Sequence, residues 1–338
     1  MQAIASEMQR IAKELLKKGE VDAVLGFARG ELNTQSVPHI ATKESEASQL
    51  LFDRFSGKAL SKYLTEDYFL DLFLQGKKVA VFVKGCDYQA LNQLLKEERV
   101  DYEKLYLIGV ECPGMIHRQK LAEALGEEPE AKDLDFQDEK VVDRETGREI
   151  PYEDITSPFC RVCAYNFPEQ PNNVHEMIQI DPSFKQPAGS DTGEIELRKA
   201  VEDIEKMPRE ERLNFWQIYL NNCRRCFSCR NACPVCTCLK CVFDRETPMF
   251  MDRATDQLAQ HQFYHLIRAF HVADRCVGCG ECERVCPEQI PLHLLHQKLI
   301  QDIEALYGEF RPGIDEEPTP LAQAKENDPD PFEKEARS

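Results

Sequence analysis

The sequence predicts an α/β domain with a mostly parallel sheet, followed by a mainly α-helical domain. Up to about residue 125, apolar segments typical of buried strands alternate with segments of helical periodicity, which favours a parallel sheet with helical crossovers. Beyond residue 194, helical apolar stripes instead flank two cysteine-rich runs. A chain of 338 residues is long enough for two domains or slightly more.

The strands and helices of the first domain are short and follow one another directly. In chain order they are expected at residues 4–18 (helix), 21–27 (strand), 37–41 (strand), 44–55 (helix), 78–83 (strand), 90–95 (helix), 105–110 (strand) and 116–125 (helix). The strand at 78–83 is apolar on both faces, as buried parallel strands are. The charged segment 127–150 is expected to be an insertion with a hairpin turn at 144–147.

Two runs share the spacing C-x2-C-x2-C-x3-C-P, one over residues 223–234 and one over 276–287. This is the spacing of bacterial ferredoxins with two 4Fe–4S clusters, in which the fourth cysteine of each run binds the other cluster. The predicted ligand sets are Cys223, Cys226, Cys229 and Cys286 for one cluster, and Cys276, Cys279, Cys282 and Cys233 for the other. Structural zinc also uses C-x2-C pairs, but it needs neither the third cysteine nor the C-P ending.

Residues 234–275, between the runs, form a longer segment than a compact ferredoxin needs, so a helical ferredoxin domain is expected. A helix is expected at 194–222, ahead of the first run. Two further helices carry apolar stripes that we expect in the core: Phe263, Leu266, Ile267 and Phe270 on one, and Leu292, Leu295, Leu299, Ile303 and Leu306 on the other.

Four further cysteines predict a third 4Fe–4S cluster in the α/β domain. Cys86 and Cys112 follow two neighbouring strands, at the carboxyl edge of the sheet where open α/β folds bind ligands. Cys160 and Cys163 form a CxxC pair in a proline-flanked segment. Two alternatives stay open: Cys86 and Cys112 as small buried hydrophobes, and the CxxC as a redox pair.

The role of Cys236, Cys238 and Cys241 is not decided by spacing. They could belong to a further cluster with a non-cysteine ligand, replace a ligand in the two sets above, or shield a cluster. His261, His265 and His271 are expected to be surface or packing residues rather than ligands.

Composition favours a protein that docks on basic partner surfaces. The net charge is −18, from 42 basic and 60 acidic residues, which disfavours nucleic acid and anionic membranes as partners. The start of the chain lacks an apolar signal segment, and no apolar run reaches the length of a membrane span. The fifteen cysteines are therefore expected to be reduced thiolates in the cytoplasm, in an anaerobic cell.

The expected domain boundaries follow from these patterns. They are an α/β domain at 1–180, a Pro-, Gly- and Ser-rich linker at 181–193, a helical ferredoxin domain at 194–310 and an acidic, disordered tail at 311–338.

Several segments resemble those of a known family. Residues 81–91 (VFVKGCDYQAL) and 105–112 (LYLIGVEC) are similar to segments of the beta subunits of coenzyme F420-reducing hydrogenase and related formate dehydrogenases. The resemblance covers about residues 1–180. Residues 215–300 separately resemble the helical ferredoxin of heterodisulfide reductase C-type subunits.

The resemblance implies an α/β domain that carries FAD and a 4Fe–4S cluster bound by Cys86, Cys112, Cys160 and Cys163. Members of the family pass electrons between flavin, clusters and a catalytic partner subunit. The family's glycine-rich, flavin-lining segment is replaced here by residues 5–14, and no glycine precedes Gly19. Because glycine allows a backbone to approach a cofactor closely, the chain is expected foremost to relay electrons through clusters within a larger oxidoreductase. The alternative is a flavin-bearing subunit that itself exchanges hydride with coenzyme F420 or another soluble carrier.

Overall fold

The computed structural model describes residues 2–137, 139–163, 165, 167–168, 173–179, 191–247, 251, 257–324 and 326. The chain divides into two compact units, Met1–Ile195 and Glu196–Ser338, and each is described by itself. Most of the expected linker, residues 181–190, lies outside the described residues.

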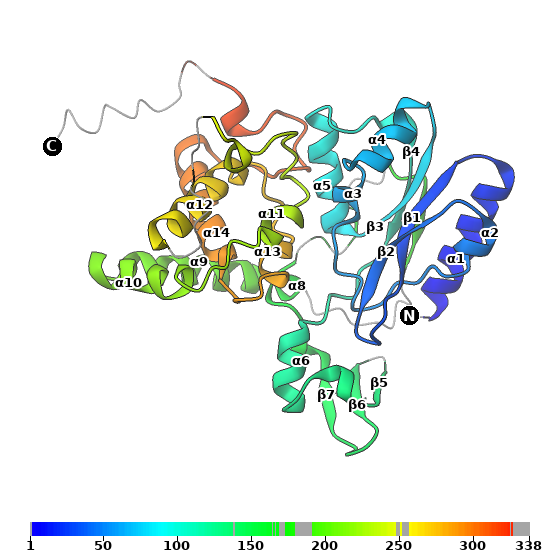
Figure 1. Ribbon diagram of the computed structural model, residues 1–338, viewed down its shortest axis with the longest axis horizontal. Coiled ribbons are helices and arrows are strands. Elements are labelled where there is room, and N and C mark those ends of the chain that lie inside the picture. Colours follow the sequence, from blue (N-terminus) through cyan, green and yellow to red (C-terminus); the bar gives the residue numbers. More distant parts are fainter. Residues whose placement is uncertain are drawn as a thin grey trace. The chain divides into compact units, whose positions relative to one another are not determined.

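The first unit is built on a five-stranded, mostly parallel sheet with the order β2-β1-β3-β4-β8 (Figure 1). Only the β1–β2 pair is antiparallel, and the other neighbours are parallel. The strands are β1 (Ala23–Arg29), β2 (Ser36–Ala41), β3 (Val79–Val83), β4 (Leu105–Val110) and β8 (Glu176–Ile178). All five residues of β3 are buried, because helices cover both faces of the sheet. The predicted fold class is confirmed.

Helices α1 and α5 lie on opposite sides of this sheet in Figure 1. The apolar positions Ile4, Met8, Ile11 and Leu15 of α1 are buried, as their helical spacing predicts. The helices and short 3-10 turns of the first unit are α1 (Gln2–Lys18), α2 (Glu44–Ala47), α3 (Leu60–Tyr63), α4 (Asp67–Leu74), α5 (Gly85–Lys96), η1 (Tyr102–Lys104), α6 (Arg118–Leu125), η2 (Pro129–Ala131), α7 (Tyr152–Ile155) and α8 (Pro158–Arg161).

The helix expected at 44–55 forms only over α2, so the prediction was wrong for residues 48–55. After Ala47 the chain turns at Ser48 and Gln49 and then pairs with β1, where the Leu51 amide donates to the Phe27 carbonyl at 2.8 Å. The two residues form an isolated antiparallel bridge. Pairing with the sheet therefore overrides the local helical pattern, as tertiary context often does.

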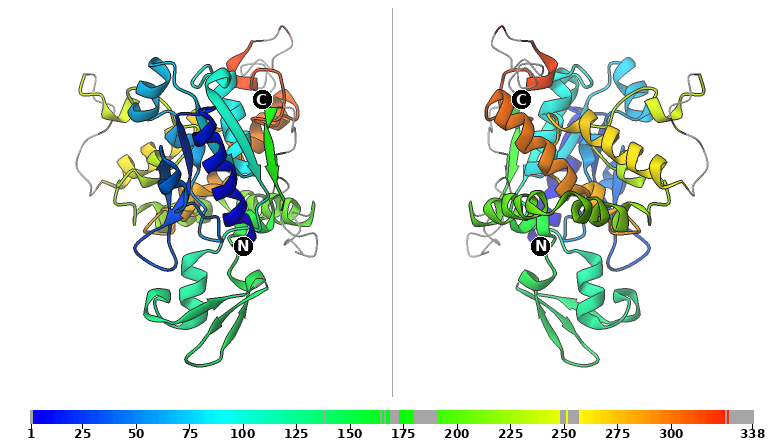
Figure 2. Two further views of the ribbon diagram at one scale, coloured as in Figure 1. Left: turned by 90° about the vertical axis from the view of Figure 1, so that its right-hand side faces the viewer. Right: turned by 90° about the vertical axis from the view of Figure 1, so that its left-hand side faces the viewer.

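The insertion at 127–150 forms a small sheet of its own with the order β5-β6-β7. Its strands are β5 (Leu134–Phe136), β6 (Lys140–Asp143) and β7 (Glu149–Pro151), and Gly147 takes the left-handed conformation in the expected hairpin (φ 72°). Buried Leu121 of α6 packs with Val141 and Ile150 of this sheet. The lobe projects from the edge of the larger sheet in both views of Figure 2.

The second unit is helical, as predicted. Its helices and 3-10 turns are α9 (Asp191–Lys206), α10 (Arg209–Leu220), α11 (Ser228–Asn231), η4 (Val242–Asp244), α12 (Leu258–Val272), α13 (Glu281–Arg284), α14 (Leu292–Tyr307) and η5 (Pro320–Ala322). The single helix expected at 194–222 is instead two helices, because Pro208 caps the start of α10 and cannot continue α9. None of the described helices combines the length and apolarity needed to cross a bilayer.

The apolar stripe expected to be core on α12 is largely exposed. Phe263, Leu266 and Phe270 are 38%, 46% and 51% exposed. The buried face of α12 is mostly polar and consists of His261, Tyr264, His265, Arg268, Ala269 and Val272. The expectation was wrong because α12 turns these polar side chains toward the cysteine runs, as described below.

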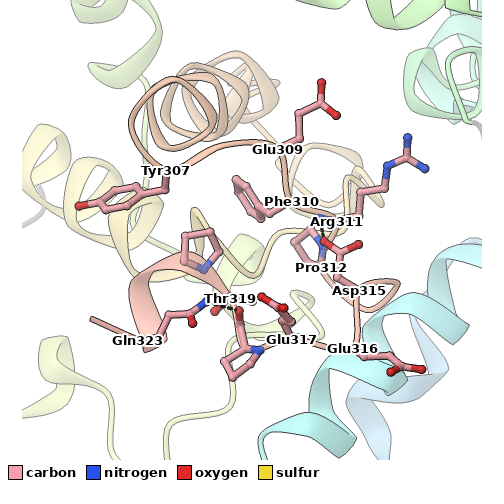
Figure 3. Close-up of a pocket in the computed structure, with 12 residues that line it drawn as sticks. Tyr307, Glu309, Phe310, Arg311, Pro312, Asp315, Glu316, Glu317, Thr319 and Gln323 are labelled. Carbon is pink, nitrogen blue, oxygen red and sulfur yellow. Dashed lines mark hydrogen bonds between the residues drawn. The ribbon is translucent and has the colours of Figure 1, made fainter. Parts of the chain in front are cut away.

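The segment after α14 differs from the expected disordered tail in its first part, since residues 311–324 are described. The Leu321 amide donates to the Asp274 carboxylate at 3.1 Å, and Thr319 is buried. The folded segment lines a pocket of about 390 Å³, and the polar, proline and aromatic residues around it lie between Tyr307 and Gln323 (Figure 3). No cysteine lines this pocket. Residues 325 and 327–338 lie outside the described residues.

Candidate cluster-binding sites

The two cysteine runs fold into loops of the same conformation. Arg225 and Phe227 of the first run have φ angles of 48° and 60°, and Gly278 and Gly280, at the equivalent positions of the second run, have 64° and 72°. Phe227 and Gly280 each cap a one-turn helix, α11 and α13, and these two helices pack against each other. The left-handed conformation is unusual for arginine and phenylalanine, so the first loop is held by its surroundings.

Cys286, the last cysteine of the second run, lies beside the first run. Burial raises the pKa of the Cys286 thiol, and negative charge on Cys229 and Cys226 raises it further. Burial also raises the pKa of Cys223 to about 11, with Cys229, Cys286 and Cys226 adding repulsion. Three of the four cysteines of the first predicted ligand set, Cys223, Cys229 and Cys286, pack in one core cluster with Tyr264, and Cys226 is exposed.

Cys233, the last cysteine of the first run, lies beside the second run in the same manner. Burial raises the pKa of Cys276 to about 11, and the charge of Cys233 adds to the rise. The pKa of Cys282 is raised by burial and by repulsion from Cys233 and Cys276. The loop between Cys276 and α13 also carries Cys279, which is half-buried.

Polar groups contact two sulfurs of the first set. The Arg225 amide donates to Cys223 Sγ at 3.3 Å, and His265 Nε2 lies 3.2 Å from the same sulfur. The Tyr264 hydroxyl lies 3.4 Å from Cys229 Sγ. Both side chains come from α12 and are almost fully buried.

The polar face of α12 was missed as a functional feature. His265 is a packing residue, as expected, but it packs on a predicted ligand, and Tyr264 and Arg268 were not singled out at all. A signal was present, because His261, Tyr264, His265 and Arg268 recur at helical spacing on one face. His271 is exposed, as expected.

The three unassigned cysteines have different surroundings. A hydrogen bond from Cys236 is the main cause that lowers the pKa of Cys233 to about 5. Burial lowers the pKa of Arg230, but hydrogen bonds from its guanidinium to Asp244 and to Cys241 raise it above its usual value. Cys238 is exposed. Cys236 thus contacts a predicted ligand, whereas Cys238 faces solvent.

In the first unit, main-chain pairing anchors the CxxC segment next to Cys112. Ile116 and Thr156 form an isolated antiparallel bridge, and the Ser157 amide donates to the Met115 carbonyl at 2.8 Å. The chain thus enters α8, which contains Cys160, only a few residues from the point where Cys112 follows β4.

The chain after the CxxC pair closes over the end of β3. Gly85 begins α5, directly before Cys86, and a Cβ atom at Gly85 would come to 1.7 Å from the Tyr165 carbonyl oxygen. The next nearest group outside Tyr165 is the Phe167 amide nitrogen, at 3.0 Å. Only glycine permits this close approach of two backbone segments.

These two features bring the four predicted cysteines of the first unit together. Burial raises the pKa of Cys112 to about 12, with repulsion from Cys160 as the next contribution. Burial raises the pKa of Cys163 to about 11, and Cys160 adds to it. The pKa of Cys86 is likewise raised by burial, with further repulsion from Cys163 and Cys112.

A buried lysine lies beside this group. Lys84 is 3% exposed, and its ammonium group donates to Asp87 at 2.5 Å and to the Lys58 carbonyl at 2.8 Å. Burial opposes the charge, but Asp87, Cys86 and Cys112 hold the pKa of Lys84 above its usual value. The ammonium group is therefore a fixed positive charge next to two of the four thiols.

A buried arginine lies beside the segment that follows β4. Arg54 donates to the Pro113 carbonyl at 2.6 Å, and its guanidinium carbon lies 3.8 Å from the centre of the Tyr152 ring. Burial lowers the pKa of Arg54, and Tyr152, Cys112 and Cys160 oppose that change. The cysteines of the first unit thus face two cations.

The chemistry of these donor sets fits iron–sulfur clusters. Thiolate ligands are anionic, and buried cations with sulfur-directed donors stabilise them in place of water. No group of three or more cysteine, histidine, aspartate or glutamate side chains within the described residues could hold a single metal ion.

Two family models match the chain. Residues 76–237 match the family described as the C terminus of the coenzyme F420 hydrogenase/dehydrogenase beta subunit. Residues 219–290 match the 4Fe-4S dicluster domain. The first match includes all four cysteines of the first unit, and the second includes both cysteine runs.

Similar proteins come from methanogens. The F420-dependent formate dehydrogenase subunit beta of Methanocaldococcus jannaschii is 25% identical over 362 residues, covering 91% of this chain and 92% of the relative. The F420-dependent formate dehydrogenase 1 subunit beta of Methanococcus maripaludis is 25% identical over 359 residues, covering 91% and 90%. A chain of the F420-reducing NiFe hydrogenase complex from Methanosarcina barkeri has 17% identity and a TM-score of 0.37, covering 61% of this chain and 76% of that one.

Proposed function

The chain resembles the beta subunits of coenzyme F420-reducing hydrogenases and formate dehydrogenases, and from this premise we propose that it is an iron–sulfur electron-transfer subunit of a multi-subunit oxidoreductase. The observation that carries the proposal concerns the last cysteine of each run. Cys286, from the second run, lies with cysteines of the first run, and Cys233, from the first run, lies with cysteines of the second. Support comes from the packing of Cys286 in one core cluster with Cys223 and Cys229, and from the charge of Cys233, which adds to the raised pKa of Cys276.

The proposal includes three clusters. Two would be bound in the second unit by the crossed sets, Cys223, Cys226, Cys229 and Cys286, and Cys276, Cys279, Cys282 and Cys233. The third would be bound in the first unit by Cys86, Cys112, Cys160 and Cys163. Support for the third comes from mutual repulsion among these partly buried thiols and from the closure of the CxxC segment over Gly85.

The residues of the chain have three tasks in this function. When bound, the clusters supply reversible one-electron oxidation and reduction. The cysteine thiolates hold them, and burial of sulfurs such as Cys229 and Cys233 excludes water. Cations such as Lys84 and Arg54 offset the negative charge of the thiolates, which lowers the cost of burying them.

The proposed partners are the other subunits of the oxidoreductase. A cluster needs an electron donor and an acceptor, and the two formate dehydrogenase relatives are themselves named as subunits. The net charge of −18 favours basic docking surfaces on those partners and disfavours nucleic acid. A cytoplasmic location is part of the proposal.

A second candidate function is direct exchange with coenzyme F420 through a bound FAD. The two relatives are named as F420-dependent, which favours the coenzyme but does not mention a flavin. The segment that precedes the first strand is α1, and its apolar face, with Met8 and Ile11, is buried in the core. This helix supplies no glycine-rich loop for a flavin, so we place this candidate second.

Quantitation of iron, sulfide and flavin on protein purified without oxygen tests both candidates. The relay proposal expects iron and sulfide in equal amounts at the level of three 4Fe–4S clusters, without flavin. Stoichiometric FAD together with F420 oxidation by the isolated chain would favour the second candidate. Zinc without sulfide would overturn both.

A further inference from the structure

Arg268 occupies a buried position in the second unit and has no acidic partner there. The side chain, on α12, is 3% exposed. Its Nη2 donates to the Cys229 carbonyl at 2.9 Å, and its Nη1 donates to His296 Nε2 at 2.9 Å. Nε has no hydrogen-bond partner among the described residues.

Neither partner of Arg268 balances its charge. A carbonyl is neutral, and His296 must be neutral because the nitrogen that faces Arg268 accepts a hydrogen bond. No carboxylate forms an ion pair with Arg268 among the described residues. A buried cation without an anion is strongly unfavourable, so the folded protein must supply negative charge in another form.

The charges that Arg268 faces are cysteine thiolates. On the buried face of α12, Arg268 lies one helical turn from Tyr264, whose core cluster includes Cys229 and Cys282, and one turn from Val272, which packs with Cys233. Burial lowers the pKa of Arg268, and negative charge on Cys233, Cys282 and Cys229 opposes that change. Cys229 belongs to one predicted ligand set, and Cys233 and Cys282 belong to the other. The guanidinium is therefore placed to act on both clusters of the second unit.

Two neighbours of Arg268 on α12, His265 and Tyr264, contact cysteines of only one of the two predicted ligand sets. His265 Nε2 contacts Cys223 Sγ at 3.2 Å, and the Tyr264 hydroxyl contacts Cys229 Sγ at 3.4 Å. A cluster-bound thiolate can only accept, so both groups donate to sulfur. His265 Nδ1 has no partner among the described residues, which leaves the contact with sulfur as the ring's polar interaction.

We infer that the buried face of α12 sets the reduction potentials of the two clusters in the second unit. Arg268 raises the potential of both clusters, whereas His265 and Tyr264 raise only that of the cluster bound by Cys223, Cys226, Cys229 and Cys286. This inference rests on the proposed function, because it requires bound clusters.

The direction follows from charge. A 4Fe–4S cluster with four thiolate ligands is anionic, and reduction adds one electron to it. A fixed positive charge or a hydrogen bond to sulfur stabilises the more negative, reduced form. The resulting rise in reduction potential is large when the positive group is buried, since water does not screen its charge.

Redox titrations of the anaerobic holoprotein, followed by electron paramagnetic resonance, test the inference. Arg268→Gln is expected to change the oxidised-to-reduced ratio of both clusters by about tenfold or more at fixed potential, which is about 59 mV for one electron. Arg268→Lys retains the charge and is expected to stay near the wild type. Arg212→Gln is the matched control, because it removes the same charge from a surface pair with Glu205.

The single-cluster contacts make a second test. His265→Asn and Tyr264→Phe are expected to lower only the potential of the Cys223-side cluster, which a Cys226→Ser variant identifies by its altered signal. If Arg268→Gln fails to bind iron, the reduction potentials measured in His265→Asn and Tyr264→Phe test the inference instead.

The outcomes separate the inference from the proposed function. Unchanged potentials in iron-replete Arg268→Gln, or in both His265→Asn and Tyr264→Phe, would overturn the inference while the clusters remain. Equal shifts in Arg212→Gln and Arg268→Gln would also overturn it, because they would show a general charge effect. A wild-type protein without any 4Fe–4S signal would instead overturn the proposed function.

Discussion

The carbonyl oxygen of Tyr165 lies against the α-carbon of Gly85, so close that a Cβ atom there would come to 1.7 Å from it. This contact joins the segment after the CxxC pair to the turn that carries Cys86. Two backbone segments from distant parts of the sequence therefore meet where the third cluster is proposed.

Gly85→Ala is expected to push the two segments apart and to remove the third cluster. The added methyl meets backbone, which cannot yield as a side chain can, so a loss of about 1–3 kcal/mol in stability is expected. Iron analysis and chemical unfolding measure the two effects. Gly30→Ala is the control, because the three atoms nearest to its Cβ would all belong to the flexible side chain of Gln35, and it is expected to retain full iron. Full iron in Gly85→Ala would contradict the closure.

Cys86→Ala is expected to lower iron and sulfide by the content of one 4Fe–4S cluster. The remaining cysteines of the first unit cannot complete four ligands. The signals of the two clusters in the second unit should be retained. Cys238→Ala is the matched control, because Cys238 is exposed and outside the proposed ligand sets. Intact iron content in Cys86→Ala would reject the third cluster.

Cys286→Ser is expected to damage the cluster bound by Cys223, Cys226 and Cys229 and to affect its neighbour less. The reason is the position of Cys286 beside Cys226 and Cys229. Spectra of the reduced protein distinguish the two clusters. Cys233→Ser is expected to produce the reverse pattern. Loss of the Cys276-side cluster in Cys286→Ser would show that ligation is not crossed.

Gly278→Ala is expected to reduce stability by about 1–2 kcal/mol, the cost of a left-handed conformation in a residue with a side chain. Gly278 has φ 64° and open space where a Cβ would lie, so no clash adds to this cost. The cluster should still assemble, because the first run carries Arg225 at the equivalent position. Denaturant unfolding and iron content test this, and loss of the cluster would show that the two loops are not equivalent.

Removal of iron by a chelator is expected to loosen the second unit more than the first. The core around Tyr264 in the second unit includes cysteines such as Cys229, whereas the larger core of the first unit is chiefly strands and helices of aliphatic residues. Without clusters, Arg268 would lose its counter-charge. Hydrogen exchange should show faster exchange in α12 and α14 with protection retained in β3 and β4. Equal protection in both units would contradict this.

The apolar patterns of the sequence predicted helices and strands correctly where burial against the sheet is the only influence on the segment. The apolar spacing of α1 and the uniformly apolar β3 predicted their burial, because each buries one side or both sides against the sheet. The patterns failed at 44–55, where pairing with β1 takes over, and at Pro208, which was overlooked within a helical stretch.

The stripe of Phe263, Leu266 and Phe270 shows a different limit. Periodicity identifies an apolar face, but it does not say which face the fold buries. On α12 the polar face is buried, because it has sulfur and backbone groups to contact, and the apolar face is largely exposed.

The sequence by itself determined the element order of the sheet domain and the two cysteine runs, because strand alternation and ligand spacing are local properties of the chain. Tertiary structure decided which cysteines meet and what surrounds them. The approach of Tyr165 to Gly85, and the position of Arg268 between cysteines of two runs, depend on contacts between residues far apart in sequence. No local pattern encodes such contacts, since they form only when whole elements pack.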